Sequence, residues 1–297
     1  MVYCDICEKS SIGRKRKMDV REIDKLKYAE EVFNIWEYSF PGDRTPQDLE
    51  TRKKKMAEEQ GTLYAASFEG ESMAAVIVNY TYTIAVREAQ FKMGGIGGVA
   101  SLSEYRRGGR VREIMRFLLN YMYDNDFVMS ALGPFSYEFY GKFGYAHAFD
   151  SWVATLPAAS LKKVPYTGGE YYRAKPEDAA DMLKVYNTFV ANMNGPAIRS
   201  EQDMAKIFKT AREEMPHKYM YLYKNSDGQI TGYIDFQIRD RLFKVREIFY
   251  TDADAFNALI HFIGLHGSSA EKIEINAKRD FPAFFLAKEP FHVEFGS

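Results

Sequence analysis

The sequence is poor in cysteine and almost without net charge. Its two cysteines, Cys4 and Cys7, both fall within the first seven of 297 residues. They cannot form a disulfide framework, and a reducing cytoplasm is therefore the default compartment. The net charge of −1 gives no overall attraction to nucleic acid or to an anionic membrane. No apolar run approaches the roughly 18 residues of a membrane-spanning helix, and the polar N-terminus is unlike a secretory signal.

The composition also lacks the signs of extended disorder. Hydrophobic residues make up 46% and charged residues 27% of the chain, which is typical of globular domains, and the length suffices for two of them. Residues 1–17 are interpreted as an N-terminal tail. Its Cys4-x-x-Cys7 lacks a second pair of zinc ligands, and its basic run, residues 14–17, is interpreted as a solvated cluster. Met18 is an alternative start of the chain.

One stretch, residues 98–112, organises the first half of the chain. An apolar run ends there, a basic turn follows, and an amphipathic helix begins. The turn and the first helical residue combine arginine with glycine: Arg106, Arg107, Gly108, Gly109 and Arg110. Four apolar residues then recur at helical spacing: Val111, Met115, Leu118 and Met122. One face of this helix is therefore predicted to be apolar.

A helix that begins after such a turn is suited to binding an anion. The first N–H groups of a helix lack intrahelical partners, and the helix dipole favours negative charge at that end. Two adjacent glycines allow the backbone to approach a phosphate closely, and the three arginines supply positive charge. The sequence therefore predicts a cradle for a pyrophosphate group.

Two motifs resemble the GNAT acetyltransferase superfamily. Arg106-x-x-Gly109-x-Val111 is similar to the signature R/Q-x-x-G-x-G/A, which binds the pyrophosphate of acetyl-CoA, with Val in place of the small last residue. Phe139-Tyr140-x-x-Phe143-Gly144-Tyr145 resembles a common GNAT feature, and the whole segment from Pro134 to Tyr145 resembles the enhanced-intracellular-survival (Eis) branch of that superfamily. The resemblance covers residues 18–291. It implies that residues 106–111 hold the pyrophosphate, and that the main chain of Val99 and Ser101 pairs with the pantetheine amides.

The predicted fold class is α+β, with two tandem GNAT-like units, each a mixed, mostly antiparallel sheet flanked by helices. The predicted boundaries are a catalytic domain at 18–156, a linker at 157–169 and a second domain at 170–297. In the second domain the junction equivalent to the cradle is Thr251-Asp252-Ala253-Asp254-Ala255. It has two acids and no glycine, so this domain is predicted to lack a working coenzyme site.

Two other patterns in the first half have competing interpretations. The helix predicted from residue 29 to 40 carries Trp36 and Phe40, which are most simply core residues; the resemblance makes them candidates for the wall of the acceptor pocket. Gly95 to Ala100 matches the dinucleotide fingerprint G-x-G-x-x-G/A. That fingerprint needs its glycines in the turn between strand and helix, and the Rossmann interpretation is therefore rejected. Glycines within a strand indicate a bulge or a close approach to a ligand.

The resemblance assigns the general acid to Tyr140. A tyrosine hydroxyl with a pKa near 10 can protonate a leaving thiolate, although Tyr140 could also serve only in packing. The sequence does not select a residue as the general base. In Eis relatives it is the terminal carboxylate of a third, sterol-carrier-like domain, whereas this chain ends at Ser297; a water-relayed Glu88 or Glu138 is conceivable. The five histidines have neither metal-ligand nor triad spacing, so no metal site is predicted.

These features predict an acetyl-CoA-dependent N-acetyltransferase. Its acceptor would be a primary amine: a small amine, an aminoglycoside-like polyamine or a lysine side chain, with the second unit helping to wall the acceptor cleft. The alternative is a coenzyme-A-binding regulatory or truncated module without turnover. A nucleic-acid-associated protein that uses the basic tail is a third hypothesis, which the near-zero net charge disfavours. The protein is expected to be cytoplasmic, without a nucleic-acid or membrane partner, and the resemblance implies a homo-oligomer.

Overall fold

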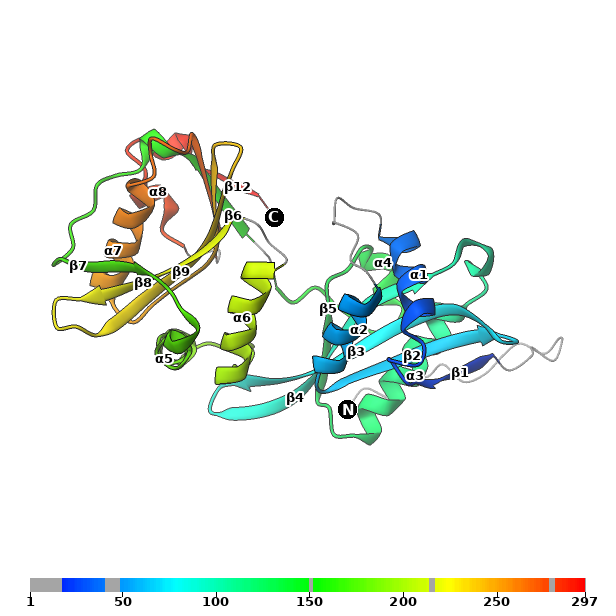
Figure 1. Cartoon of the computed structure of the whole chain (residues 1–297). Helices are drawn as coiled ribbons and strands as arrows, with labels where there is room; N and C mark the ends of the chain where they lie inside the picture. The colour runs from blue at the N-terminus through cyan, green and yellow to red at the C-terminus, as the bar shows by residue number, and fades with distance from the viewer. Residues whose placement is uncertain (1–17, 41–48, 150–151, 214–216, 278–280, 297) are drawn as a thin grey trace. The chain divides into compact units, whose positions relative to one another are not determined.

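The computed structural model describes residues 18–40, 49–149, 152–213, 217–277 and 281–296, with the backbone alone for 209–213. The chain divides into two compact units (Figure 1). Within the described residues, the first comprises 18–83 and 91–146, and the second comprises 84–90 and 147–296. No described helix is both long and apolar enough to cross a membrane.

The first unit contains a five-stranded sheet in the order β1-β2-β3-β4-β5. Its strands are β1 (Asp19–Ile23), β2 (Thr62–Glu69), β3 (Ser72–Val86), β4 (Ala89–Ser101) and β5 (Met129–Leu132). Its helices are α1 (Ala29–Ser39), α2 (Leu49–Glu58), α3 (Arg110–Asp124) and the short α4 (Tyr137–Gly141). Strands β1, β2 and β3 pair antiparallel, whereas β4 and β5 run parallel.

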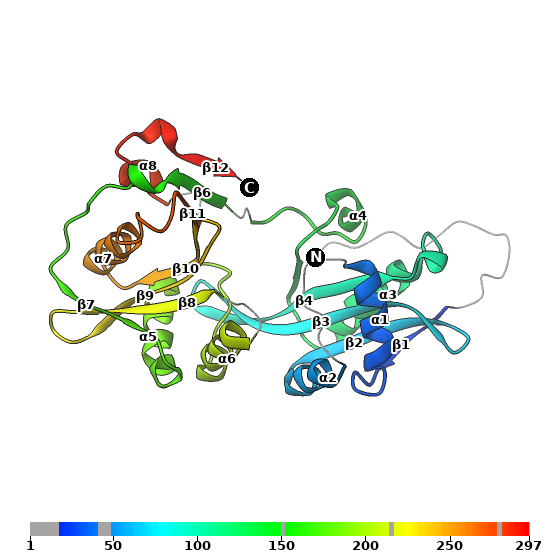
Figure 2. The ribbon, with the colours of Figure 1, turned by 45° about the horizontal axis from the view of Figure 1, so that its top comes forward.

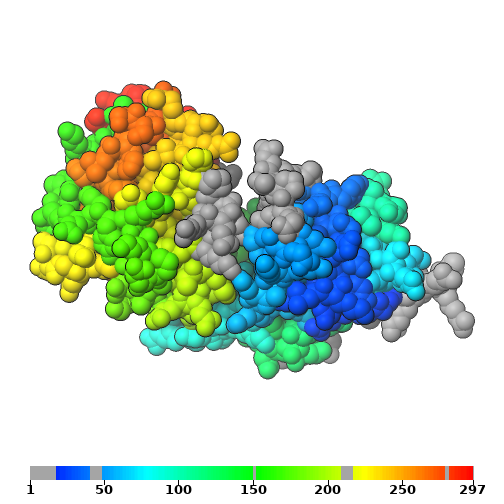
Figure 3. Space-filling model, in the orientation of Figure 1, coloured from blue at the N-terminus to red at the C-terminus, as the bar shows by residue number. Residues whose placement is uncertain are grey.

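Helices cover both faces of this sheet. On one face, α1 and α2 bury Val32, Ile35 and Met56 against β2 and β3; in the space-filling view these helices contribute to the blue surface of this unit (Figure 3). On the other face, α3 buries Met115, Leu118 and Met122. The apolar face predicted for α3 is therefore confirmed, and it fixes the N-terminus of this helix next to the end of β4.

The second unit contains a seven-stranded sheet in the order β12-β6-β11-β10-β9-β8-β7. Its strands are β6 (Trp152–Pro157), β7 (Gly169–Arg173), β8 (Lys218–Asn225), β9 (Ile230–Arg239), β10 (Leu242–Tyr250), β11 (Lys272–Ala277) and β12 (Glu294–Gly296). Its helices are α5 (Ala179–Val190), α6 (Glu201–Glu213), α7 (Ala253–Gly264) and α8 (Ala283–Leu286). Figure 2 shows α7 on one side of the sheet and α5 and α6 on the other.

The structure moves the predicted domain boundary. The sequence places the strand that ends near residue 156 in the first domain, but β6 pairs with β11 and β12 in the second sheet. Its Ala154 and Leu156 are buried in the core of the second unit. The predicted linker, residues 157–169, also begins as part of this unit, because Leu161 is buried and bridges to Ala287.

The tip of the β3–β4 hairpin, residues 84–90, also belongs to the second unit. Ile84 is buried and forms a bridge with Ala197, and the Gly195 amide donates to the carbonyl oxygen of Ala85 at 2.7 Å. Residues 84–90 therefore pack within the second unit, although the strands β3 and β4 that carry them belong to the sheet of the first. The sequence indicates how long the strands are, but it does not indicate that the tip of the hairpin packs within the second unit.

Candidate active site

Strands β4 and β5 part within the first unit. Their parallel pairing runs from Met93 opposite Met129 to Ile96 opposite Leu132, where β5 ends, while β4 continues to Ser101. Residues 97–101 therefore present backbone groups on the side that β5 has left, and such groups require other partners. Val99 and Ser101, predicted to offer their main chain to a ligand, both lie in this stretch.

The turn after β4 leads directly into α3. Arg106 and Arg107 are exposed, and Arg107 has a positive φ of 61°. Gly109 is the N-cap of α3 with φ 85°, a left-handed conformation that glycine adopts without strain, and no side chain caps the helix there. The first N–H groups of α3 therefore remain available to an anion. Gly108, also exposed, precedes the cap.

Two residues of the predicted cradle turn their side chains into the fold. The guanidinium of Arg110 donates to the carbonyl oxygen of Phe68 at 2.7 Å and forms an ion pair with Glu69. The side chain of Val111 packs against the core beneath α3. The expectation that Arg110 supplies charge to a phosphate therefore differs from the structure, in which Glu69 already neutralises that charge. Both residues can offer their backbone N–H groups.

Aromatic rings cover the glycines of β4 on the face opposite α3. A Cβ atom on Gly95 would lie 2.5 Å from the ring of Tyr82, and one on Gly97 would lie 2.9 Å from the ring of Tyr80. Gly94, in contrast, faces Met122 of α3. The sequence analysis expects a bulge or the close approach of a ligand at these glycines, whereas in the structure side chains approach the backbone of Gly95 and Gly97. The sequence does not indicate that tyrosines fill this space.

Trp36 reaches the same strand from α1. Its indole N–H donates to the carbonyl oxygen of Gly98 at 2.9 Å, and Gly98 has a positive φ of 59°. The Trp36 ring also contacts Tyr64, with ring centroids 6.1 Å apart. Phe40, the other predicted wall residue, caps the end of α1 and has 51% of its surface exposed. The structure therefore places Trp36 at β4 and leaves Phe40 outside the core.

Tyr140 lies in α4, which follows β5. Its ring packs at 5.1 and 5.2 Å, centroid to centroid, from Phe139 and Phe135, and at 6.2 Å from Tyr145. The Tyr145 hydroxyl lies 2.6 Å from that of Ser130, which donates to the carbonyl oxygen of Gly94. This chain of contacts holds Tyr140 near the point where β4 and β5 part.

The Tyr140 side chain is 3% exposed. Burial raises the pKa of its hydroxyl above the usual value of 10.0, and the nearby Tyr145 raises it further. No described residue makes a hydrogen bond with this hydroxyl. Tyr140 is therefore a protonated donor at neutral pH, as a general acid requires.

The carboxylates that could act as the general base lie in different surroundings. Glu138 is exposed and paired with Lys142, and Glu88 is exposed at the hairpin tip that belongs to the second unit. Glu59, which the sequence analysis does not single out, accepts a hydrogen bond from the Tyr64 hydroxyl at 2.8 Å. Burial raises the pKa of its carboxyl, against the opposing effect of that hydrogen bond. The described residues include no group of three or more His, Cys, Asp or Glu that could hold a metal ion.

Comparisons with known proteins show the family and the fold. Two family models match the chain, each described as an acetyltransferase (GNAT) domain, over residues 19–148 and 195–296. A comparison with curated proteins found no match. The chain therefore belongs to the GNAT acetyltransferases, with two GNAT domains in tandem. It is an acyltransferase.

Solved structures share the fold over nearly the whole chain. A conserved protein of unknown function from Enterococcus faecalis V583, described as a probable N-acyltransferase, is 24% identical with a TM-score of 0.83; the match covers 95% of this chain and 70% of that one. A GCN5-related N-acetyltransferase from Kribbella flavida is 21% identical with a TM-score of 0.78, covering 94% and 69%. Eis1 from Mycobacterium abscessus is 17% identical with a TM-score of 0.73, covering 95% and 71%.

Proposed function

We propose that this protein transfers an acetyl group from acetyl-CoA to a primary amine. The parting of β4 and β5 directly before the uncapped N-terminus of α3 carries the proposal. An extended ligand can pair with the free edge of β4 and place its pyrophosphate on the first turn of α3. A coenzyme A thioester has these two parts in this order.

Different residues of the first unit bind different parts of the coenzyme. Val99 and Ser101 offer main-chain groups to the pantetheine amides. Gly108, Gly109, Arg110 and Val111 offer backbone N–H groups to the pyrophosphate, and the exposed side chains of Arg106 and Arg107 offer positive charge. The Arg110 side chain holds α3 against the end of β2 instead.

Tyr140 serves as the general acid. When the amine attacks the thioester carbonyl, the carbon–sulfur bond breaks and a thiolate leaves. Transfer of the Tyr140 proton to that sulfur avoids the release of a free anion, because its buried hydroxyl is protonated at neutral pH. The amine must be neutral when it attacks, and its proton passes to solvent or to a carboxylate.

The acceptor approaches β4 from the face that carries Trp36, Tyr80 and Tyr82. Aromatic rings in this position favour amines that bring apolar or cationic surface. Phe40 extends this wall at the end of α1. A small amine, an aminoglycoside-like polyamine and a lysine side chain all meet these requirements. The two cysteines and the net charge of −1 support a cytoplasmic enzyme without nucleic-acid or membrane partners, and the Eis resemblance supports a homo-oligomer.

The test is calorimetric titration with acetyl-CoA, followed by measurement of thiol release with a panel of amines. Binding with amine-dependent release supports the transferase. Binding without release supports the alternative, a coenzyme-A-binding module without turnover. Absence of binding contradicts both proposals and the assignment of residues 99–111.

A further inference from the structure

A tyrosine of α1 contacts the turn between β4 and α3. The turn begins with a short 3₁₀ segment, Ser103–Tyr105, after which the N–H of Arg106 donates to the carbonyl oxygen of Ser103 at 3.1 Å. The hydroxyl of Tyr38, in the last turn of α1, is hydrogen-bonded to the hydroxyl of Ser103. This bond joins residues 65 positions apart in the sequence, and it fixes the position of the Tyr38 ring beside the turn.

The ring of Tyr38 also holds the side chain of Arg106. The guanidinium carbon of Arg106 lies over this ring, 5.5 Å from its centroid, which is within the range of a cation–π attraction. Both residues are exposed. A ring does not neutralise a cation, whereas the carboxylate of Glu69 neutralises Arg110. Arg106 is therefore oriented by a neutral partner, and its charge stays available to a phosphate.

Such orientation favours the binding of an anion. An exposed arginine samples many rotamers, and a bound phosphate selects only a few of them, at a cost in conformational entropy. A contact that already restricts the side chain in the free protein reduces this cost. The guanidinium also presents its N–H groups as a planar fork, so its orientation decides how well it bonds to phosphate oxygens.

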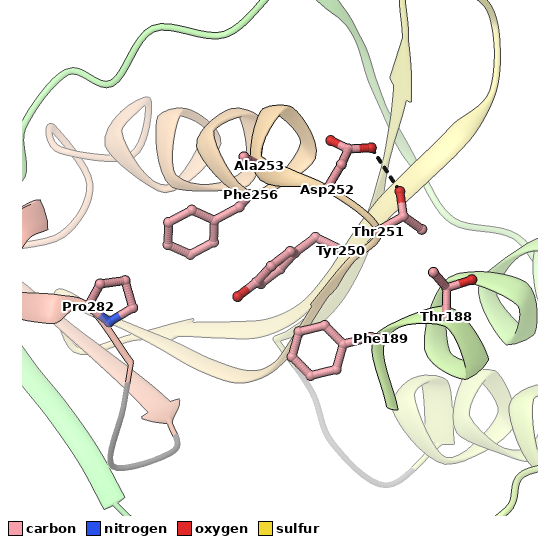
Figure 4. A pocket seen from close by; sticks show the side chains of 8 residues that line it. All are labelled: Thr188, Phe189, Tyr250, Thr251, Asp252, Ala253, Phe256 and Pro282. Carbon is pink, nitrogen blue, oxygen red and sulfur yellow. Dashed lines mark hydrogen bonds between the residues drawn. The ribbon is translucent and has the colours of Figure 1, made fainter. Parts of the chain in front are cut away.

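The corresponding junction of the second unit has the opposite arrangement. There Asp252 caps α7 and accepts the N–H of Ala255 at 2.8 Å, and the Thr251 hydroxyl donates to its other carboxylate oxygen at 2.9 Å (Figure 4). The described residues that line the depression of about 480 Å³ at this cap include no arginine or lysine. The contact between a ring and an arginine thus accompanies the uncapped helix of the first unit.

We propose that Tyr38 is a positioning residue for coenzyme binding, whose ring holds the Arg106 guanidinium in place for the pyrophosphate. The inference rests on the proposed function, because the phosphates belong to acetyl-CoA. Tyr38 acts through Arg106 and does not touch the reacting atoms. The same helix carries Trp36, whose indole N–H donates to the carbonyl oxygen of Gly98. One helix therefore contacts both the parted stretch of β4 and the turn that follows it.

Calorimetric titration of the full chain with acetyl-CoA tests this role. Tyr38→Leu removes the ring and the hydroxyl, and it should weaken acetyl-CoA binding about threefold or more. Tyr38→Phe keeps the ring and removes only the bond to Ser103, so its loss should be smaller. Because Tyr38 is exposed, both variants should unfold at the temperature of the wild type. The matched control is Tyr123→Leu, which replaces another exposed tyrosine, near the end of α3, and should leave the affinity unchanged.

A double-mutant cycle with Arg106→Gln distinguishes positioning from a general structural effect. If Tyr38 acts through Arg106, Tyr38→Leu should weaken binding less than about 1.5-fold in the Arg106→Gln background. Full affinity in Tyr38→Leu, or equal losses in the two backgrounds, overturns the inference and leaves the proposed function intact. Absence of acetyl-CoA binding by the wild type contradicts the proposed function itself, and the inference with it.

Discussion

The side chain of Arg110, the first residue of α3, forms an ion pair with the side chain of Glu69, the last residue of β2. The same guanidinium also donates to Phe68 and Ser67, and it is largely buried. An arginine within the predicted phosphate cradle thus fastens the helix to the sheet. This contact separates the structural role of one arginine from the binding role proposed for its neighbours.

Replacement of Arg110 should therefore affect stability rather than coenzyme binding. Arg110→Leu is expected to lower the free energy of unfolding by about 1–3 kcal/mol, because it leaves the carbonyl oxygen of Phe68 without its donor. The dissociation constant for acetyl-CoA should change by less than about twofold. The matched variant Arg107→Gln should show the reverse, with unchanged stability and roughly tenfold weaker binding. Urea unfolding measures the stability of both variants, and calorimetry measures their binding of acetyl-CoA. Weaker binding with unchanged stability in Arg110→Leu would mean that the Arg110 side chain belongs to the cradle after all.

The effect of a negative charge placed at position 109 can be tested separately from the effect of the backbone conformation there. Asp and Asn both tolerate the left-handed backbone that Gly109 adopts at φ 85°. Gly109→Asp places a carboxylate at the proposed phosphate position and should weaken acetyl-CoA binding at least about 100-fold. Gly109→Asn adds a similar volume without charge and should weaken binding much less. Equal losses in the two variants would show that volume, not charge, decides binding there.

Tyr140→Phe tests the general acid. The variant should lower kcat about 100-fold, with the dissociation constant for acetyl-CoA changed less than about twofold. Because burial raises the Tyr140 pKa above 10.0, the wild-type rate should not decline through loss of this proton until the pH exceeds about 10. Stopped-flow thiol release across this range provides the measurement. An unchanged kcat in the variant would assign Tyr140 to packing alone.

Gly98 and Trp36 should be energetically coupled. A Cβ atom on Gly98 would lie 2.7 Å from the Trp36 ring, and the φ of 59° is itself unfavourable for alanine. Gly98→Ala should therefore lower the free energy of unfolding by about 1–3 kcal/mol. In a Trp36→Ala background the loss should shrink toward the backbone part alone, about 1 kcal/mol. Strict additivity in the double-mutant cycle would mean that the ring moves aside at no cost.

Glu59 should give stability a pH dependence of known sign. Because burial raises its folded pKa above the usual 4.5, the folded state holds this proton more tightly than the unfolded state. Its contribution is full below pH 4.5 and is lost as the pH rises through the folded pKa. The unfolding temperature of Glu59→Gln, relative to wild type, should therefore be higher at pH 7 than at pH 4. A constant difference, or one of opposite sign, would contradict the raised pKa.

Local patterns account for the elements that need no distant partner. The spacing of Met115, Leu118 and Met122 predicts the buried face of α3, and the paired strands around residues 69–72 are confirmed. The order of strand, basic turn, helix, strand and Tyr-rich segment carries the resemblance to the family. These features depend on residues a few positions apart, and a single sequence records them directly. The roles of Tyr140 and of residues 99–111 stay predictions until they are measured.

The sequence by itself determined the place of the proposed cradle through short-range periodicity and composition, and its motifs gave the two-unit α+β plan and the family through their resemblance to GNAT acetyltransferases. Only the tertiary structure decided that β6 joins the second sheet, that Arg110 faces Glu69, and that Tyr80, Tyr82 and Trp36 cover the glycines of β4. Each of these contacts joins residues far apart in the chain. An apolar strand or an arginine can satisfy many partners equally well, and the packing of the whole unit selects one of them.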